Sequence, residues 1–260
     1  MDLKNKAVLL TGASSGIGYS LAHHLAKEGC KLALIARRQN LLNKLSGDIS
    51  SDNLVTFQCD VGKREQVNEI FGKVRDHFGK IDIAILNAGV SGRTALKSYN
   101  GNQAKEIFDT NSLSIVYAIE QLLPDFMERK DGMIVGISSL ADVRGFPKSG
   151  FYNASKAAAT ILLESLRIEL KPFNVKVITV KPGFVRTPMT DKNEFHMPFM
   201  IDVDNASEII LAGIKNEKRV IEFPLPTVLA TKLIKILPNF LFDKLAGRKL
   251  PDRKDKVITG

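Results

Sequence analysis

The chain contains 260 residues, of which 44% are hydrophobic and 25% are charged, an ordinary globular composition with enough apolar material for a full core. It carries no internal repeat or low-complexity linker, so we expect residues 1–260 to form a single domain. The net charge of +9 favours an anionic partner, such as a phosphorylated cofactor, an acidic carrier protein or lipid headgroups, but no recognition motif or aromatic platform accompanies it, which argues against nucleic acid.

The start of the chain passes directly into an apolar run at 7–10, without the charged stretch and long apolar segment of a secretory signal. We therefore expect a cytoplasmic protein. Cys30 and Cys59 each lie beside an apolar segment, which favours two buried free thiols over a disulfide or a metal site. No cluster of His, Cys and carboxylate residues in the sequence suggests a metal.

Short apolar runs of strand length alternate with stretches of helical spacing. The runs lie at 7–10, 31–36, 54–58, 81–86, 133–137, 176–180 and 219–223. Helical spacing occupies 17–28, 64–78, 102–130, 152–171 and 206–216, with Asn205 as the N-cap of the last. Strands that are apolar throughout are buried on both faces, as in a parallel sheet covered by helices on either side. The prediction is an α/β fold with a doubly wound parallel sheet, a Rossmann-type three-layer α/β/α sandwich.

A glycine-rich turn joins the first predicted strand to the first predicted helix, and it reads Thr11-Gly12-Ala13-Ser14-Ser15-Gly16-Ile17-Gly18. Gly12 permits the tight turn, Gly16 lets the backbone approach a pyrophosphate, and Gly18 allows the helix to pack against the sheet. The amides of the helix N-terminus then face the anion, with Ser14, Ser15 and Ile17 in the same turn. These residues predict a dinucleotide cofactor.

This turn resembles the Thr-Gly-x-x-x-Gly-x-Gly pattern of the short-chain dehydrogenase/reductase family, and the resemblance covers roughly the first 190 residues. It implies hydride transfer between a nicotinamide cofactor and a carbonyl/secondary alcohol pair. The further family positions described below are assigned by this resemblance.

The second predicted strand ends in Ala36, followed by Arg37 and Arg38, about twenty residues beyond the glycines. A carboxylate there would accept hydrogen bonds from a free ribose 2′-hydroxyl, whereas guanidinium groups favour a 2′-phosphate. The sequence therefore favours NADP(H) over NAD(H), against the alternative that both arginines are solvated at a strand end. Many NADP-dependent relatives also carry a basic residue inside the glycine turn, where this chain has Ser15.

The resemblance assigns Asp60 and Val61, after the third strand, to the adenine pocket, although Asp60 is almost equally suited to N-cap the helix that follows. Asn87-Ala88-Gly89, after the fourth strand, matches most of the family's Asn-Asn-Ala-Gly motif, with Leu86 in place of the first Asn. The segment after the sixth strand resembles the family's Pro-Gly segment. Cofactor contacts are implied there for Pro182, Gly183, Val185 and Thr187.

Tyr152 and Lys156 lie one helical turn apart and form the predicted catalytic pair. A free phenol has a pKa of about 10, so catalysis needs a neighbour that stabilises the phenolate, and Lys156 lies on the same helix face. Alone, this spacing is common on ordinary helix surfaces. The glycine turn is what favours catalysis.

The family pattern adds a serine at Ser139, whose neighbour Ser138 is easily confused with it, and an asparagine at Asn111, with Ser114 replacing the usual glycine. The resemblance implies that Tyr152 donates a proton while Ser139 stabilises the developing alkoxide. Lys156 would lower the pKa of Tyr152 and bind the nicotinamide ribose, and Asn111 would hold a water on Lys156.

Two segments on the substrate side have weaker patterns. Residues 188–203 lack periodicity and carry Met189, Phe195, Met197, Phe199 and Met200, which favours a lid over a lipophilic substrate rather than a loop packed on itself. The C-terminal extension, about 224–260, is apolar at 225–237 and 240–245 with interspersed lysines, too short and charged to span a bilayer. We expect it to fold over the cleft or a subunit interface, with peripheral membrane contact as the alternative.

The sequence thus predicts an NADP(H)-dependent oxidoreductase for a lipophilic carbonyl/alcohol substrate, acting as a homodimer or homotetramer. The helices containing Asn111 and Tyr152 often form the dimer interface in this family, and small or apolar side chains would allow it here at Ala157, Ala158, Ala159, Ile161, Leu162 and Ser165. The alternatives are a 3-oxoacyl-carrier-protein reductase, which would suit the basic charge, and a non-catalytic NADPH-sensing binding protein.

Overall fold

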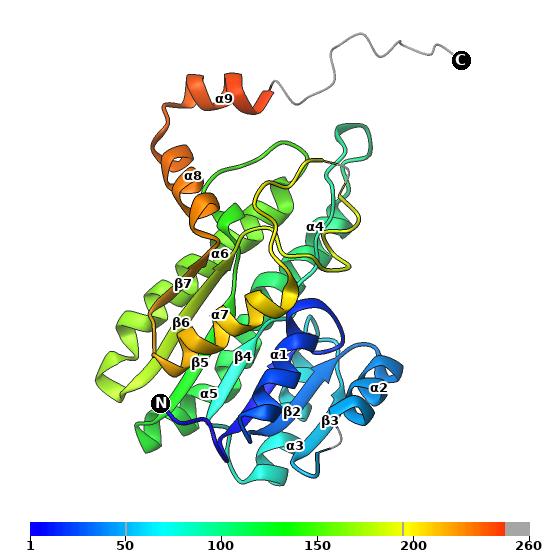
Figure 1. Ribbon diagram of the computed structural model, residues 1–260, viewed down its shortest axis with the longest axis vertical. Helices are drawn as coiled ribbons and strands as arrows, with labels where there is room; N and C mark the ends of the chain where they lie inside the picture. Colours follow the sequence, from blue (N-terminus) through cyan, green and yellow to red (C-terminus); the bar gives the residue numbers. More distant parts are fainter. Residues whose placement is uncertain (50, 194, 248–260) are drawn as a thin grey trace.

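The computed structural model describes residues 1–49, 51–193 and 195–247 (Figure 1). Seven parallel strands form one sheet in the order β3-β2-β1-β4-β5-β6-β7. Their bounds are β1 (Ala7–Thr11), β2 (Lys31–Ala36), β3 (Leu54–Gln58), β4 (Ile83–Leu86), β5 (Gly132–Ile137), β6 (Val175–Pro182) and β7 (Val220–Phe223). The strand order reverses direction between β1 and β4, which opens a crevice at their carboxyl ends. The predicted doubly wound α/β fold is confirmed.

Helices cover both faces of the sheet. Their bounds are α1 (Gly16–Lys27), α2 (Gln39–Ile49), α3 (Arg64–Phe78), α4 (Gly101–Phe108), α5 (Ser114–Arg129), α6 (Gly150–Glu169), α7 (Val203–Lys215), α8 (Leu225–Ile236) and α9 (Asn239–Gly247). Side chains of α1, α2 and α7 form a core with one sheet face, and those of α3, α5 and α6 form a second core with the other. The central strands are therefore buried on both sides, as predicted, whereas the edge strand β3 is only partly buried.

Helix α2 was not predicted. It buries Leu42 and Leu45, while most of its other side chains are polar and exposed. Two buried leucines give too little periodicity to distinguish a helix from a loop, so packing against the sheet decides this segment.

The single helix predicted at 102–130 was wrong, because a π-helical turn (Asp109–Leu113) separates α4 from α5. Thr110, Asn111 and Ser112 are buried in this turn. The Ser114 hydroxyl donates a 2.6 Å hydrogen bond to the Thr110 carbonyl and so helps satisfy the widened backbone. Ser114, where the family has glycine, is thus compatible with a break in the helix.

The predicted N-cap at Asn205 was also wrong, since this residue lies within the first turn of α7. A backbone bridge between Val185 and Ile201 keeps the chain extended, and Asp202 takes the N-cap position in an extended conformation. The Asp202 carboxylate accepts a 3.0 Å hydrogen bond from Arg186 instead of capping the helix.

Two further sequence predictions can be placed on this fold. Cys30 and Cys59 are free and buried, as predicted. On α6, Ala158, Ile161 and Ser165 are exposed, Leu162 is partly buried against the core, and Ala159 is fully buried and therefore unavailable to a partner. Within the described residues, no helix is both long and apolar enough to cross a membrane.

Candidate active site at the carboxyl ends of the strands

A cleft of about 450 Å³ lies where the central strands end. The predicted site residues that line it are Gly12, Ser14, Ser15, Gly16, Ile17, Arg37, Arg38, Val61, Asn87, Ala88, Gly89, Ser139, Tyr152, Lys156, Pro182, Gly183, Val185 and Thr187. The structure therefore brings together residues from the glycine turn, five strand ends and α6. Three predicted residues do not line the cleft but contact residues near it: Gly18, Asp60 and Asn111.

Sequence reasoning missed several lining residues: Ala36, Cys59, Val90, Thr110 and Ile137. Each lies within two residues of a predicted residue at a strand end or in the π-helical turn. The carboxyl ends of parallel strands form one edge of the sheet, so the strand ends themselves were the signal that could have identified them.

The glycine turn packs tightly against the end of β4. Gly12 has a φ of +68°, and a Cβ there would lie 2.8 Å from the Ala88 Cα atom. At Gly18 a Cβ would lie 2.3 Å from the Gly12 carbonyl oxygen. Any side chain at either position would push the turn off the strand, which explains both glycines physically.

Hydrogen bonds hold this packing in place. The Thr11 hydroxyl oxygen accepts 3.0 Å hydrogen bonds from the backbone amides of both Asn87 and Ala88. The Asn87 side-chain amide donates to the Thr11 carbonyl at 3.0 Å and to the Gly12 carbonyl at 3.3 Å. Asn87 therefore shapes the turn through its side chain, in addition to the close backbone approach expected of it.

The two arginines lie at the end of β2. Arg38 donates from Nη2 to the hydroxyls of Ser14 at 3.0 Å and Ser15 at 2.9 Å. Arg37 is exposed and pairs with Glu106 at 3.7 Å. The Arg38 guanidinium thus reaches the part of the glycine turn where the sequence lacks a basic residue.

Asp60 does not cap a helix. Its Oδ1 accepts a 3.1 Å hydrogen bond from the Gly62 amide, while α3 begins after Lys63, which makes no side-chain cap. The Asp60 amide donates to Gln66 Oε1 at 2.7 Å. Asp60 therefore folds the connection between β3 and α3, and Val61 beside it lines the cleft.

Ser139 and Tyr152 both line the cleft, and Ser139 lies close enough to the phenol to lower its pKa. Ser139 Oγ also accepts from the Ala141 amide at 3.1 Å. The adjacent Ser138 turns toward α6 instead, where its Oγ donates to the Lys156 carbonyl at 2.9 Å and lies 2.6 Å from the Thr160 hydroxyl. Geometry thus separates the two serines: Ser138 fastens β5 to α6, and Ser139 meets the phenol.

Burial raises the pKa of Tyr152, the hydrogen bond from Ser139 lowers it, and the charge of Asp142 raises it further. The effect of the Lys156 ammonium on the pKa of Tyr152 stays a prediction. The Lys156 Nζ atom lies 6.0 Å from the centre of the Tyr152 ring and donates to the Ile137 carbonyl at 2.8 Å. Burial also lowers the pKa of Lys156 to about 8, which weakens its charge.

Asn111 uses its amide to hold the backbone beside the cleft. Its Oδ1 accepts from the Val90 amide at 2.8 Å, and its Nδ2 donates to the Val90 carbonyl at 2.9 Å and to Ser155 Oγ at 3.0 Å. The Asn111 oxygen and the Lys156 ammonium converge on Gly89, where a Cβ would lie 3.4 Å from each. These contacts differ from the predicted water contact and give Asn111 a structural task as well.

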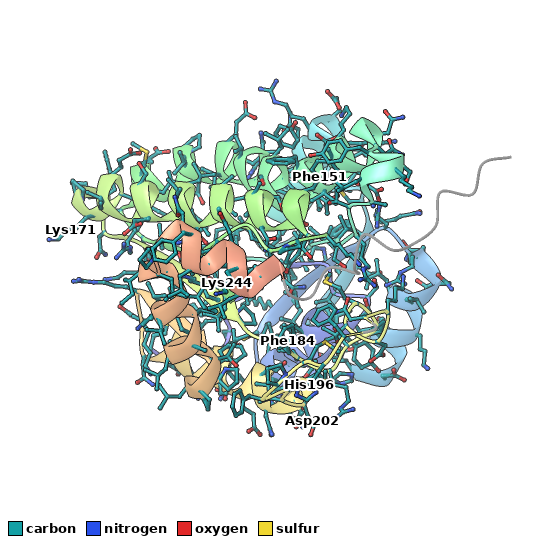
Figure 2. The ribbon with its side chains drawn as sticks, turned by 90° about the horizontal axis from the view of Figure 1, so that it is seen from above. Phe151, Lys171, Phe184, His196, Asp202 and Lys244 are labelled. Atoms are coloured by element: carbon teal, nitrogen blue, oxygen red, sulfur yellow. The ribbon has the colours of Figure 1, made fainter. Side chains whose placement is uncertain are left out.

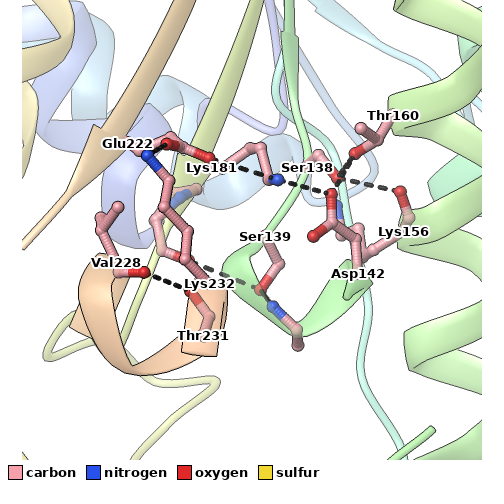
Figure 3. A network of polar contacts seen from close by, with 12 residues as sticks. Ser138, Ser139, Asp142, Lys156, Thr160, Lys181, Glu222, Val228, Thr231 and Lys232 are labelled. Carbon is pink, nitrogen blue, oxygen red and sulfur yellow. Dashed lines mark hydrogen bonds and ion pairs between the residues drawn. The ribbon is translucent and has the colours of Figure 1, made fainter. Parts of the chain in front are cut away.

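A chain of charged groups extends from buried Asp142, beside the Ser139 turn, to exposed Lys232 on α8 (Figure 3). Asp142 Oδ2 accepts from Thr160 at 2.6 Å and lies 3.2 Å from Lys181 Nζ. Lys181 lies 3.3 Å from Glu222, which in turn lies 3.4 Å from Lys232. Sequence reasoning assigned no role to Asp142 or Lys181, although a lysine at the end of a buried strand needs a buried anionic partner.

The C-terminal helices pack on the segment that follows Ser139. Arg144 donates at 3.0 Å both to the Leu237 carbonyl and to Asn239 Oδ1, and its guanidinium lies 4.3 Å from the centre of the Phe242 ring. Seen from above, α9 crosses the view between α6 and the segment that carries Phe184 and His196 (Figure 2). This arrangement fits an extension folded over one side of the cleft. The predicted extension is described as far as Gly247.

The predicted lid contributes little to the lining. Of its apolar residues only Met189 lines the cleft, together with Pro188 and Thr190. The rings of Phe195 and Phe184 pack edge to face at 5.9 Å, and Phe199 is exposed. The segment contains turns and no helix among its described residues.

Among the described residues, one group of His and carboxylate side chains outside the cleft has its oxygen and nitrogen atoms close together. His24, Asp204 and Glu208 hold ligand atoms within 4.8 Å of one another. No local sequence pattern could identify this group, because its residues lie on α1 and α7, which are far apart in the chain but adjacent in space. A 2.7 Å contact between His24 and Asp204 joins these two helices.

Known proteins resemble this chain throughout its length. The family model described as short chain dehydrogenase matches residues 6–197. An uncharacterized oxidoreductase of Myxococcus xanthus is 34% identical over 95% of this chain and 98% of that relative. The 11-beta-hydroxysteroid dehydrogenase 1A of Arabidopsis thaliana is 37% identical over 75% of this chain and 56% of that relative.

Solved structures share the fold. A short chain dehydrogenase/reductase of Burkholderia phymatum, in complex with NAD, has a TM-score of 0.83 at 23% identity and covers 90% of this chain and 94% of its own. An alcohol dehydrogenase from the archaeon Thermococcus sibiricus, complexed with 5-hydroxy-NADP, has a TM-score of 0.75 at 27% identity, covering 85% and 95%.

Proposed function

Because this chain belongs to the short chain dehydrogenase family, we propose that it is an oxidoreductase that transfers a hydride between NADP(H) and a lipophilic carbonyl/secondary alcohol substrate. The observation that carries the proposal is that Ser139, Tyr152 and Lys156 line one cleft together with the glycine turn. The glycine turn and Arg38 form a part of the cleft that suits a phosphate group, and Tyr152 supplies a proton donor in another part.

The residues present fit a dinucleotide. Gly16 has a φ of +56° at the start of α1, where backbone amides face the cleft. Gly89 has no side chain, so its backbone borders the cleft directly beside the Lys156 ammonium. When bound, the nicotinamide would donate or accept the hydride.

In carbonyl reduction, the Tyr152 hydroxyl donates its proton to the substrate oxygen as negative charge develops there. The Ser139 hydroxyl donates a hydrogen bond to the same oxygen and stabilises the charge. Lys156 would hold the ribose of the bound cofactor and return a proton toward Tyr152, while Asn111 keeps the Val90 backbone in place. In alcohol oxidation, the same groups act in reverse.

The experiment that tests this function is turnover of purified protein with NADPH and a panel of apolar carbonyls, followed by the absorbance of the reduced nicotinamide. An acyl-carrier-protein thioester in the same panel tests the 3-oxoacyl reductase alternative. Tight NADPH binding without consumption of any panel member would instead support a non-catalytic sensor. Wild-type turnover that survives loss of both active-site hydroxyls would refute the mechanism.

NADPH should bind at least about tenfold more tightly than NADH, because charge-assisted hydrogen bonds to a 2′-phosphate contribute about 1.5–3 kcal/mol each. Arg37→Ala combined with Arg38→Ala should remove this preference. The Arg38 contacts with Ser14 and Ser15 support the assignment, since they hold the guanidinium beside the glycine turn. Dissociation constants for both cofactors measure the ratio. Arg64→Ala, which removes an exposed arginine paired with Glu120, is the matched control.

We also propose a homo-oligomer that pairs through α5 and α6. Ile161 and Ile168 project from α6 with 67% and 68% of their surface exposed, and Val116 of α5 is also exposed. Ile161→Glu should therefore convert the dimer to a monomer, whereas Ile209→Glu on α7 should not. Sedimentation velocity distinguishes these states. An unchanged sedimentation coefficient for Ile161→Glu would place the interface elsewhere.

A further inference from the structure

The outer face of α8 carries a continuous apolar stripe. Leu225, Leu229, Leu233 and Ile236 follow one another at intervals of one helical turn, and their exposed fractions are 68%, 59%, 59% and 76%. Single exposed leucines are common on protein surfaces, but a stripe along a whole helix is the pattern of a face that contacts something apolar.

The opposite face of α8 is fixed to the protein, so the stripe cannot turn inward. Val228 and Thr231 are buried there, and Lys232, at the edge of the stripe, pairs with Glu222 at 3.4 Å. Helix α9 is held in the same way by Phe242, which packs against Arg144 and lies 5.9 Å from the Phe146 ring. The fold therefore holds the apolar stripe on the surface of the protein.

Helix α9 extends this surface. Phe240 is 75% exposed and Leu245 is also exposed. Figure 1 shows α8 and α9 at one end of the molecule, the same end as the segment between β6 and α7. The carboxyl ends of the strands, and with them the cleft, face this end.

The charge of this region is strongly positive. Lys232 and Lys235 lie along one edge of the stripe on α8, and Lys244 lies on α9. From residue 224 to the end, the sequence contains eight Lys and Arg residues and three Asp residues. The basic residues beyond Gly247, which lie outside the described part of the chain, are Arg248, Lys249, Arg253, Lys254 and Lys256.

We propose that the outer face of α8 and α9 docks on an anionic lipid bilayer. The apolar stripe would enter the boundary between headgroups and acyl chains, and the flanking lysines would contact anionic headgroups. A second copy of the chain fits this face less well, because a symmetric pairing would bring the same basic segment against itself. An anionic membrane has the complementary charge.

The experiment is co-sedimentation of the full-length protein with vesicles of phosphatidylcholine alone or of phosphatidylcholine mixed with phosphatidylglycerol. We expect capture by the anionic vesicles at low salt, at least about tenfold weaker binding at high salt, and little binding to the neutral vesicles. Leu229→Ser with Leu233→Ser should reduce the partition coefficient at least about tenfold, and Lys235→Gln with Lys244→Gln should reduce it measurably. NADPH binding should be unchanged in all variants, which shows that they fold.

The matched control is Leu96→Ser with Ile209→Ser, two exposed apolar side chains that belong to neither α8 nor α9. Its binding to anionic vesicles should equal that of the wild type. The proposal fails if wild-type protein ignores anionic vesicles, or if the α8 variant binds them as well as the control does. It also fails if sedimentation velocity shows that the α8 substitutions split an oligomer while no form binds lipid, since the face would then join two copies of the chain.

Discussion

Replacing Tyr152 with phenylalanine should lower kcat by about 10²–10⁴ while leaving NADPH affinity nearly unchanged. The substitution removes the hydroxyl that lies beside Ser139 in the cleft, and the aromatic ring still packs at the start of α6. Steady-state kinetics with a carbonyl substrate and a separate NADPH titration measure the two effects.

Tyr99→Phe provides the matched control. Tyr99 packs edge to face on Phe151, next to the catalytic tyrosine, but its own side chain is exposed and lies outside the cleft lining. Its removal should leave turnover as in the wild type. If Tyr152→Phe retains wild-type kcat, another group donates the proton and the assigned role is wrong.

The raised pKa of Tyr152 also predicts how the rate depends on pH. A phenol whose pKa is raised stays protonated at and above neutral pH, so it is available as an acid for carbonyl reduction. Alcohol oxidation needs the phenolate, so its rate should increase with pH until the raised pKa is passed. A rate of oxidation that falls as the pH rises from neutrality would contradict this assignment.

Replacing Lys156 with methionine should abolish turnover, weaken NADPH binding and yet stabilise the fold near neutral pH. The side chain is 4% exposed, and burial lowers its pKa from 10.5 to about 8. The folded protein therefore binds this proton more weakly than the unfolded chain does. The resulting cost, at most about 3 kcal/mol, is fully present below about pH 8 and disappears as the pH rises toward 10.5.

Denaturant unfolding at about pH 7 and about pH 10 measures this effect. The methionine variant should be more stable than the wild type at the lower pH, and the difference should shrink at the higher one. The Ile137 carbonyl loses its partner in the variant, which offsets part of the gain. Lys171→Met, at an exposed lysine near the end of α6, should change neither activity nor the pH dependence. A variant less stable than wild type at both pH values would show that the charged lysine supports the fold.

The fold and the list of candidate site residues were largely predictable because they follow from local sequence. Apolar strands define a parallel sheet, and the glycine turn marks its first crossover. Contacts across the structure were less predictable. Arg38 was expected at the cofactor, but its reach to Ser14 and Ser15 depends on the angle at which β2 meets the turn.

The same limit explains the π-helical turn and the buried charges. The residues of 102–130 have continuous helical spacing, and only the packing of Asn111 against Val90 requires a widened turn there. Likewise, Asp142 and Lys181 are separated by much of α6 and β6, so no local pattern pairs them. Such pairs form because a charge buried without a partner of opposite sign is costly, and the tertiary fold determines which oppositely charged residue lies close enough to pair with it.

The two buried cysteines make the chain a convenient host for site-specific labelling. Burial raises the pKa of both Cys30 and Cys59 to about 12, so almost no reactive thiolate is present near neutral pH. A cysteine introduced at exposed Leu233 would therefore be alkylated much faster than either natural thiol. An environment-sensitive dye attached there would report directly, through its emission, whether the outer face of α8 meets water or hydrocarbon.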